Sequence, residues 1–216
     1  MTPPLSLLIF DCDGVLVDSE EIGIGTLLDA AREHGPLAME LSEAMRLFRG
    51  RKMAECADIL TERLGRPLPE DFIPEVRVRT ADAFRRGLKA IPGIHEALRE
   101  ITIPVCVGSN GPREKIELAL SVTGLLPRFD GRIFSSYEVG SWKPDPGLYL
   151  HAAAALGVAP ADCAVVEDSV LGVRAGVAAG MQVFAYAPAE CAADLDLPGV
   201  TCFAQMADLP DLLRLL

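Results

Sequence analysis

The segment LSLLIFDCDGVLVDS, residues 5–19, holds the clearest pattern in the chain. Its apolar run Leu5–Phe10 predicts a buried β-strand, and two aspartates, Asp11 and Asp13, follow directly. In an extended chain, side chains two residues apart point to the same side, and two such carboxylates repel each other unless they share a cation or a proton. Ligands of open α/β sheets bind outside the carboxyl ends of the strands, so the segment predicts a strand that ends in a charged site. Helix capping is the alternative explanation of a DxDG sequence taken alone.

Four later apolar runs are similar to this strand and alternate with helical stretches. They lie at Ile103–Val107, Arg132–Phe134, Cys163–Val166 and Gln182–Tyr186. Helices are predicted between them, over 112–124, 145–157 and 169–180, from their capping residues, proline starts and glycine stops. Continuous apolar strands that alternate with helices predict an α/β fold with a parallel sheet covered on both faces.

Residues 18–87 interrupt this alternation, because they show helical periodicity and no convincing strand. Helices are predicted at Glu20–His34, Ser42–Phe48, Met53–Leu64 and Glu70–Arg86. Crossovers between neighbouring parallel strands are normally far shorter than this interval. We therefore expect a discontinuous α/β core, residues 1–17 and 88–216, with a helical cap domain inserted at 18–87; a long helical crossover is the alternative.

Three later segments place polar groups at further strand-to-helix junctions. Glu167 and Asp168 follow one strand, and with the first pair of aspartates they would form an oxygen-lined site suited to Mg²⁺. Ser109 and Asn110 lie in VGSNGP, where a hydroxyl beside helix N–H groups can hold a phosphate. Lys143, in WKPDP, can neutralise phosphate charge. Each group alone is compatible with a helix cap or a solvated side chain, and only the combination indicates a phosphate site.

Composition limits the classes of partner. The chain has 20 Lys and Arg against 31 Asp and Glu, a net charge of −11, so we expect no affinity for nucleic acid or anionic membranes. No signal-peptide core or membrane span is recognisable. Six scattered cysteines without a CxxC pair predict no zinc site and mostly buried thiols in a reducing compartment. We expect a cytoplasmic monomer.

Taken together, Asp11, Asp13, Ser109, Lys143 and the Glu-Asp pair at 167–168 resemble the motifs of haloacid dehalogenase superfamily hydrolases. The chain is most similar to the β-phosphoglucomutase-like and sugar-phosphate phosphatase branch, and the resemblance covers essentially all of it. It implies a Rossmann-like core with a small α-helical cap, and a phosphatase that acts on a small phosphorylated metabolite. In the segments FRGRK, VGSNGP and SSYEVGSWKPDP the chain resembles phosphatases of sugar-acid phosphates, and this resemblance implies a sugar or sugar-acid phosphate, such as 6-phosphogluconate, as the substrate.

The resemblance also implies a role for each acidic residue. Asp11 would be the nucleophile that takes the phosphoryl group, and Asp13 would be the general acid and then the general base. Mg²⁺ would be held by the carboxylates of Asp11 and Asp168 and by the backbone carbonyl of Asp13. Glu167 would lie beside the metal, bound directly or through water.

The remaining residues would bind the substrate. Ser109 and the N–H that follows it, that of Asn110, would hold the phosphate oxygens, and Lys143 would bridge the phosphate and the nucleophile. A cluster of cations in the cap would contact a second anionic group of the substrate. We expect this cluster to comprise Arg49, Arg51 and Lys52.

Other activities of similar proteins remain open. A haloacid dehalogenase would need neither Mg²⁺ nor Asp13, and a phosphonoacetaldehyde hydrolase would need a cap lysine, for which Lys52 is the one candidate within 19–87. A phosphomutase would carry a histidine in the first cap helix, where this chain has Gly23, so a phosphatase is favoured. A non-catalytic binding protein is the fourth alternative.

Overall fold

The computed structural model describes residues 5–129, 131–187, 195 and 197–215. Its sheet has six parallel strands in the order β3-β2-β1-β4-β5-β6. The strands are β1 Leu7–Phe10, β2 Val105–Ser109, β3 Ile133–Ser135, β4 Cys163–Glu167, β5 Gln182–Tyr186 and β6 Val200–Phe203. The predicted α/β fold with a Rossmann-like parallel sheet is confirmed.

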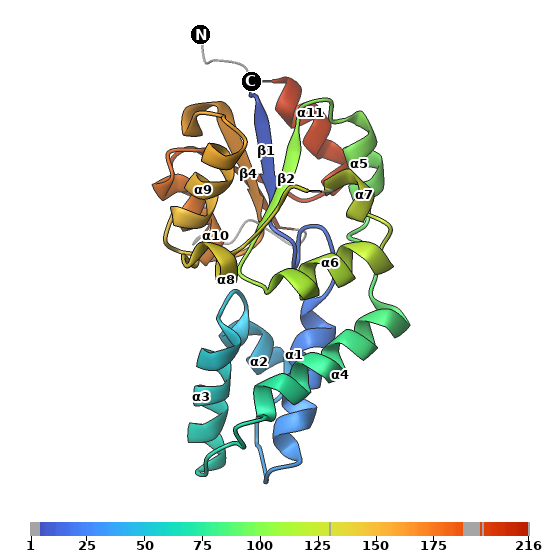
Figure 1. Ribbon diagram of the computed structural model, residues 1–216, viewed down its shortest axis with the longest axis vertical. Coiled ribbons are helices and arrows are strands. Elements are labelled where there is room, and N and C mark those ends of the chain that lie inside the picture. Colours follow the sequence, from blue (N-terminus) through green and yellow to red (C-terminus); the bar gives the residue numbers. More distant parts are fainter. Residues whose placement is uncertain (1–4, 130, 188–194, 196, 216) are drawn as a thin grey trace. The chain divides into compact units, whose positions relative to one another are not determined.

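Helices cover both faces of the sheet, with α9 and α10 on one side and α5, α7 and α11 on the other (Figure 1). Residues on either face of a central strand therefore meet a helix, which explains why β1 is apolar throughout and fully buried. The helices of this unit are α5 Ile94–Glu100, α6 Arg113–Val122, α7 Leu126–Phe129, α8 Ser136–Val139, α9 Gly147–Ala155, α10 Val170–Ala178 and α11 Leu209–Arg214, with two 3-10 turns at Pro160–Asp162 and Met206–Asp208.

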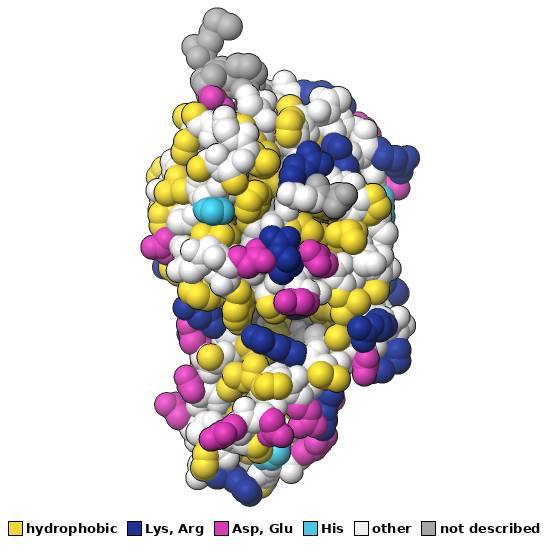
Figure 2. Space-filling view, viewed as in Figure 1, with side chains coloured by type: hydrophobic (Ala, Val, Ile, Leu, Met, Phe, Trp, Pro, Cys, Tyr) yellow, Lys and Arg dark blue, Asp and Glu magenta, His cyan; other side chains and the backbone are white. Residues whose placement is uncertain are grey.

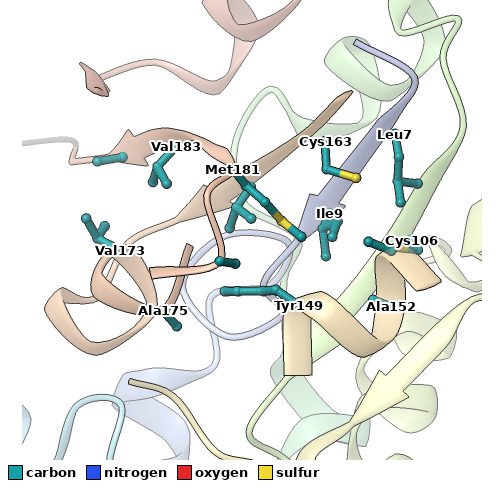
Figure 3. Packing of buried hydrophobic residues seen from close by; sticks show 14 of the residues in the cluster. Leu7, Ile9, Cys106, Tyr149, Ala152, Cys163, Val173, Ala175, Met181 and Val183 are labelled. Atoms are coloured by element: carbon teal, nitrogen blue, oxygen red, sulfur yellow. The ribbon is translucent and has the colours of Figure 1, made fainter. Parts of the chain in front are cut away.

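A buried apolar cluster fixes the helices of one face against the sheet. Ile9 of β1, Cys106 of β2 and Val165 of β4 pack with Tyr149 of α9 and Val173 of α10, and Figure 3 shows side chains of these elements converging. Burying a side chain of this size contributes about 1.5–3 kcal/mol relative to leaving it exposed. The cluster therefore holds the central strands and their flanking helices in one rigid arrangement.

The register of the central strands aligns their carboxyl ends. Phe10 of β1 lies opposite Val107 of β2 and Val166 of β4. The residues that follow these three positions therefore emerge together at one edge of the sheet, and Asp11, Ser109 and Glu167 lie at this edge.

Residues 19–88 form a second compact unit, separate from 1–18 with 89–216. It consists of α1 Glu20–Arg32, α2 Leu41–Phe48, α3 Met53–Leu64 and α4 Phe72–Gly87. Leu28, Phe48, Leu60 and Phe72 are among the buried residues of its own hydrophobic core. None of the helices in the described part of the chain is long and apolar enough to cross a membrane. The role of this unit as a cap stays a prediction.

The cysteines fall into two groups. Cys12, Cys56, Cys106 and Cys163 are buried free thiols, which agrees with the expected packing role. Cys202 is disulfide-bonded, which the sequence did not indicate, and Cys191 lies outside the described residues.

Candidate active site

Three buried carboxylates meet at the carboxyl ends of β1 and β4. Asp11 directly follows β1, Glu167 is the last residue of β4 and Asp168 comes next. One oxygen of each lies within 4.8 Å of the other two. Their residues are only 8%, 0% and 7% exposed, so water screens their repulsion poorly and a cation is required.

Lys143 supplies one cation within this group. Its Nζ donates to Asp11 Oδ1 at 2.7 Å and to Glu167 Oε1 at 2.6 Å, and its side chain is 3% exposed. The ammonium also lies 5.1 Å from the ring centroid of Tyr149. Burial lowers the pKa of Lys143, but the two carboxylates outweigh it and raise the pKa above its ordinary value. The lysine therefore remains charged.

Glu167 accepts hydrogen bonds at both oxygens. Oε1 accepts from Lys143 and from the hydroxyl of Tyr149 at 2.8 Å. Oε2 accepts from the backbone N–H groups of Asp168 and Ser169, at 3.0 and 3.1 Å, and from the Ser169 hydroxyl at 3.0 Å. Burial alone raises the pKa of Glu167, but Lys143 and these donors bring it below its ordinary value. The carboxylate is ionised and held in one orientation.

Asp11 is stabilised less completely as an anion. Burial, followed by the charges of Glu167 and Asp13, raises its pKa to about 7, although Lys143 opposes the shift. A further cation beside Asp11 would restore the ionised form. The carboxylates of Asp11, Glu167 and Asp168 form an all-oxygen donor set, which suits a hard divalent cation.

Two glycines allow the backbone to approach these carboxylates. Gly14 has φ +76°, and a Cβ there would lie 2.1 Å from Asp168 Oδ2. A Cβ on Gly172, in the first turn of α10, would lie 1.8 Å from Glu167 Oε1. Any larger residue would displace the carboxylates, so the local sequence is tied to the geometry of the site.

The segment after β2 supports the loop that carries Lys143. Ser109, the last residue of β2, is 1% exposed, and its Oγ accepts from the N–H of Gly111 at 3.1 Å. Asn110 Oδ1 accepts from the N–H of Lys143 at 3.0 Å and from the hydroxyl of Ser136 at 2.8 Å. The side-chain oxygen of Asn110 thus joins its own loop to α8 and to the loop that carries Lys143. That its backbone N–H contacts phosphate stays a prediction.

Asp13 lies at the more accessible side of the site. Its side chain is 27% exposed, and Oδ2 accepts from Lys115 Nζ at 2.7 Å. The sequence did not single out Lys115 or Tyr149. Lys115 is an ordinary lysine in the first turn of a helix, without a spacing that marks it. Tyr149 offered a weak signal, because a tyrosine on a buried helix face usually has a polar partner for its hydroxyl.

The three predicted substrate cations lie in the helical unit. Arg49 Nε is 3.0 Å from Glu20 Oε1. Arg51 Nε donates to the carbonyl of Leu47 at 2.7 Å, and its guanidinium lies 3.8 Å from Glu55. Lys52 directly precedes α3. Both arginines are paired within their own unit, and the part of all three residues in substrate binding stays a prediction.

Charges of both signs are visible on one face of the molecule. On the face drawn in Figure 2, Lys and Arg side chains are interspersed with Asp and Glu side chains and with hydrophobic residues. That face therefore carries no extended field of one sign that would select a large polyanion or polycation.

Comparison with known proteins agrees with the geometry. Residues 5–180 match the haloacid dehalogenase-like hydrolase family. A 6-phosphogluconate phosphatase of Escherichia coli (strain K12) is 36% identical over 209 residues, which are 96% of this chain and 94% of that protein. A crystal structure of a haloacid dehalogenase-like protein of unknown function from Agrobacterium tumefaciens is 32% identical, with a TM-score of 0.83 and 98% coverage of both chains. A putative β-phosphoglucomutase from Thermotoga maritima is 27% identical, with a TM-score of 0.79 over 98% of this chain and 100% of that one. Strand-end carboxylates, fold and sequence lead to one assignment: the chain belongs to the haloacid dehalogenase-like hydrolases.

Proposed function

We propose that the protein is a Mg²⁺-dependent phosphatase that hydrolyses a small phosphate monoester through a covalent aspartyl-phosphate. One observation carries the proposal: Asp11, Glu167 and Asp168 each place an oxygen within 4.8 Å of the others, with Lys143 Nζ 2.7 Å from Asp11 Oδ1. Phosphoryl transfer depends mostly on positioning and on stabilising the negative charge of the phosphoryl oxygens. A nucleophile, a buried ammonium and a set of metal ligands are the parts that this chemistry uses.

In the first step, a carboxylate oxygen of Asp11 attacks phosphorus and forms an O–P bond, while the bond from phosphorus to the leaving oxygen breaks. Asp13 gives its proton to that oxygen, so the alcohol leaves neutral. Lys143 and Ser109 hold the phosphoryl oxygens. A general acid contributes roughly 10²–10⁴-fold, so most of the acceleration comes from the groups that position the phosphate and balance its charge.

In the second step, water attacks the phosphorus of the aspartyl-phosphate. Asp13, now a carboxylate, accepts a proton from the water, the bond between phosphorus and Asp11 breaks, and inorganic phosphate leaves. Both catalytic aspartates then have the protonation states with which they began. The covalent intermediate replaces one difficult displacement by two easier ones.

The residues present fit a resident Mg²⁺. Its ligands would be the carboxylates of Asp11 and Asp168 and the backbone carbonyl of Asp13, with Glu167 bound directly or through water. The fit is supported by the all-oxygen donor set and by Gly14, whose missing Cβ leaves room for Asp168 beside the backbone. When bound, Mg²⁺ supplies positive charge that keeps Asp11 ionised and offsets the charge of the phosphate.

The substrate class is a sugar phosphate or sugar-acid phosphate, and 6-phosphogluconate is the first candidate. The relative that is 36% identical over nearly the whole chain carries the name of a 6-phosphogluconate phosphatase. We further propose that Arg49, Arg51 and Lys52 contact a second anionic group of the substrate, such as a carboxylate. Paired arginines such as Arg51 can exchange an exposed carboxylate partner at little cost, because surface ion pairs contribute only about 0–1 kcal/mol.

Phosphate release from a panel of esters tests this proposal. The panel contains 6-phosphogluconate, phosphoglycolate, hexose 6-phosphates and p-nitrophenyl phosphate, each with Mg²⁺ and with EDTA. Release should require Mg²⁺, vanish in Asp11→Asn, and persist in Asp208→Asn, the same change at an exposed aspartate. Arg51→Ala and Lys52→Ala should raise KM for 6-phosphogluconate and leave KM for p-nitrophenyl phosphate unchanged. Release at the Asp11→Asn level by the wild-type protein would contradict the proposal.

A phosphomutase is the second candidate, because a putative β-phosphoglucomutase is similar over the whole chain. Gly23 occupies the place where the resemblance leads us to expect a mutase histidine, which favours hydrolysis. Labelled β-glucose 1-phosphate separates the two activities. Conversion to glucose 6-phosphate would identify a mutase, whereas free glucose and phosphate would identify a hydrolase.

A further inference from the structure

Lys115 contacts the proposed acid/base residue from a helix that carries none of the predicted site residues. It is the third residue of α6, and its Nζ donates to Asp13 Oδ2 at 2.7 Å across 102 residues of sequence. The two side chains are 34% and 27% exposed. The pair is thus half-buried, and Asp13 lies near enough to Asp11 to raise the pKa of that carboxyl group.

The stem of Lys115 passes beside the loop predicted to hold phosphate. A Cβ built on Gly111 would lie 3.6 Å from Lys115 Cδ and 3.5 Å from Ser109 Oγ. These are ordinary contact distances, so the lysine stem runs alongside the loop on its way to Asp13. Arg113, two residues earlier on the same helix, instead directs its guanidinium to Glu138 and Glu117.

We propose that Lys115 is a positioning residue that fixes the carboxyl group of Asp13, through the contact with Oδ2, in the orientation that exchanges protons with the leaving oxygen and with water. The inference rests on the proposed phosphatase function. A partly exposed aspartate can rotate about two side-chain bonds, and proton transfer needs the carboxyl oxygen within about 2.6–3.2 Å of the reacting oxygen. An ammonium held at one oxygen removes most of that freedom before substrate binds.

Two other roles of Lys115 make different predictions. If its ammonium binds the transferred phosphate, every phosphate ester loses activity without it to a similar extent. If the ion pair only stabilises the fold, the loss follows unfolding and does not depend on the leaving group. A role through Asp13 depends on the leaving group, because only a poor leaving group needs a proton.

The experiment compares kcat/KM for the best alkyl phosphate of the panel with kcat/KM for p-nitrophenyl phosphate. The constant kcat/KM reports on the steps up to and including departure of the leaving group. Of the two leaving groups, only the alkoxide needs a proton, because nitrophenolate leaves as a stable anion. Lys115→Met should lower kcat/KM for the alkyl ester by about 10–100-fold, within the range of a general acid, mainly through kcat. The same variant should change kcat/KM for p-nitrophenyl phosphate by less than threefold. Lys115→Arg should recover most of the kcat/KM lost with the alkyl ester.

Two further variants complete the test. In an Asp13→Asn background, Lys115→Met should cause no additional loss on the alkyl ester, because both changes act through one carboxyl group. Arg113→Gln removes a cation from the same helical turn and should leave the ratio between the two substrates unchanged. Equal losses on both substrates, or no loss with the alkyl ester, would overturn the inference while leaving the phosphatase proposal intact. Absence of Mg²⁺-dependent release by the wild-type protein would overturn both.

Discussion

The hydroxyl of Tyr149 should stabilise the protein through one buried hydrogen bond, and Tyr149→Phe removes that bond with little other change. Tyr149 and Glu167 are both 0% exposed, and the hydroxyl donates to Glu167 Oε1 at 2.8 Å. The phenylalanine ring keeps the apolar contacts of α9 and the stacking of Lys143 Nζ, 5.1 Å from the ring centroid. The substitution therefore isolates one donor to a buried anion.

The expected magnitude follows from the charge of the acceptor. A hydrogen bond to a charged group contributes about 1.5–3 kcal/mol to stability, compared with about 1 kcal/mol between neutral groups. Water cannot replace the lost donor, because neither residue reaches solvent. Glu167 keeps its bonds to Lys143, Asp168 and Ser169. We therefore expect a loss of about 1.5–3 kcal/mol in the free energy of unfolding, and a fall in kcat of less than about tenfold.

Urea denaturation of the metal-free protein measures the loss, with Tyr186→Phe as the matched control. Tyr186 is 7% exposed and packs against Phe203, and its hydroxyl has no hydrogen bond to a described residue. The control should stay within about 0.5 kcal/mol of the wild-type protein. Equal losses for the two variants, or no loss for Tyr149→Phe, would refute the importance assigned to the bond with Glu167.

Three further changes test other parts of the site. Gly172→Ala places a Cβ 1.8 Å from Glu167 Oε1, so we expect thermal denaturation to show a loss of about 3–5 kcal/mol in the free energy of unfolding. The control Gly23→Ala has open space around its Cβ and should raise the free energy of unfolding by up to about 1 kcal/mol. Lys143→Met leaves Asp11 without its ammonium, so kcat should fall roughly 10²–10³-fold in steady-state assays, while an unchanged kcat would contradict its role. Because the pKa of Asp11 is raised from 3.8 to about 7, the folded protein keeps a proton that the unfolded chain loses, and stability falls as pH rises between these values. In EDTA, the stability advantage of Asp11→Asn over wild type should thus be larger at pH 8 than at pH 5; a pH-independent difference would contradict the raised pKa.

The central strands could be predicted from the sequence because helices bury both of their faces. A strand of this kind is a continuous apolar run, and β1 and β4 show it clearly. Helix ends were visible for a similar local reason: Ser169 caps α10 by accepting from the N–H of Gly172, and Gly65 ends α3 with φ +65°. The edge strand β6 was missed, since three of its four residues are only partly buried and its pattern is mixed.

The candidate site could be predicted mainly where its residues lie at strand ends; Lys143, predicted from its WKPDP segment, lies instead between α8 and α9. Asp11, Ser109 and Glu167 come together because register aligns the ends of β1, β2 and β4. Lys115 and Tyr149 reach the same group from helices. Their partners are set by how each helix packs on the sheet, and no spacing in the sequence encodes that packing.

The covalent intermediate on Asp11 is the central claim, and trapping it is the most direct test. The protein is mixed with Mg²⁺ and the best ester of the panel, quenched in acid within the first turnovers, and digested for mass spectrometry. The account predicts a phosphoryl group on the peptide that contains Asp11, absent in Asp11→Asn and in EDTA. Mg²⁺-dependent release of phosphate without a phosphorylated peptide, at an undiminished rate in Asp11→Asn, would contradict it.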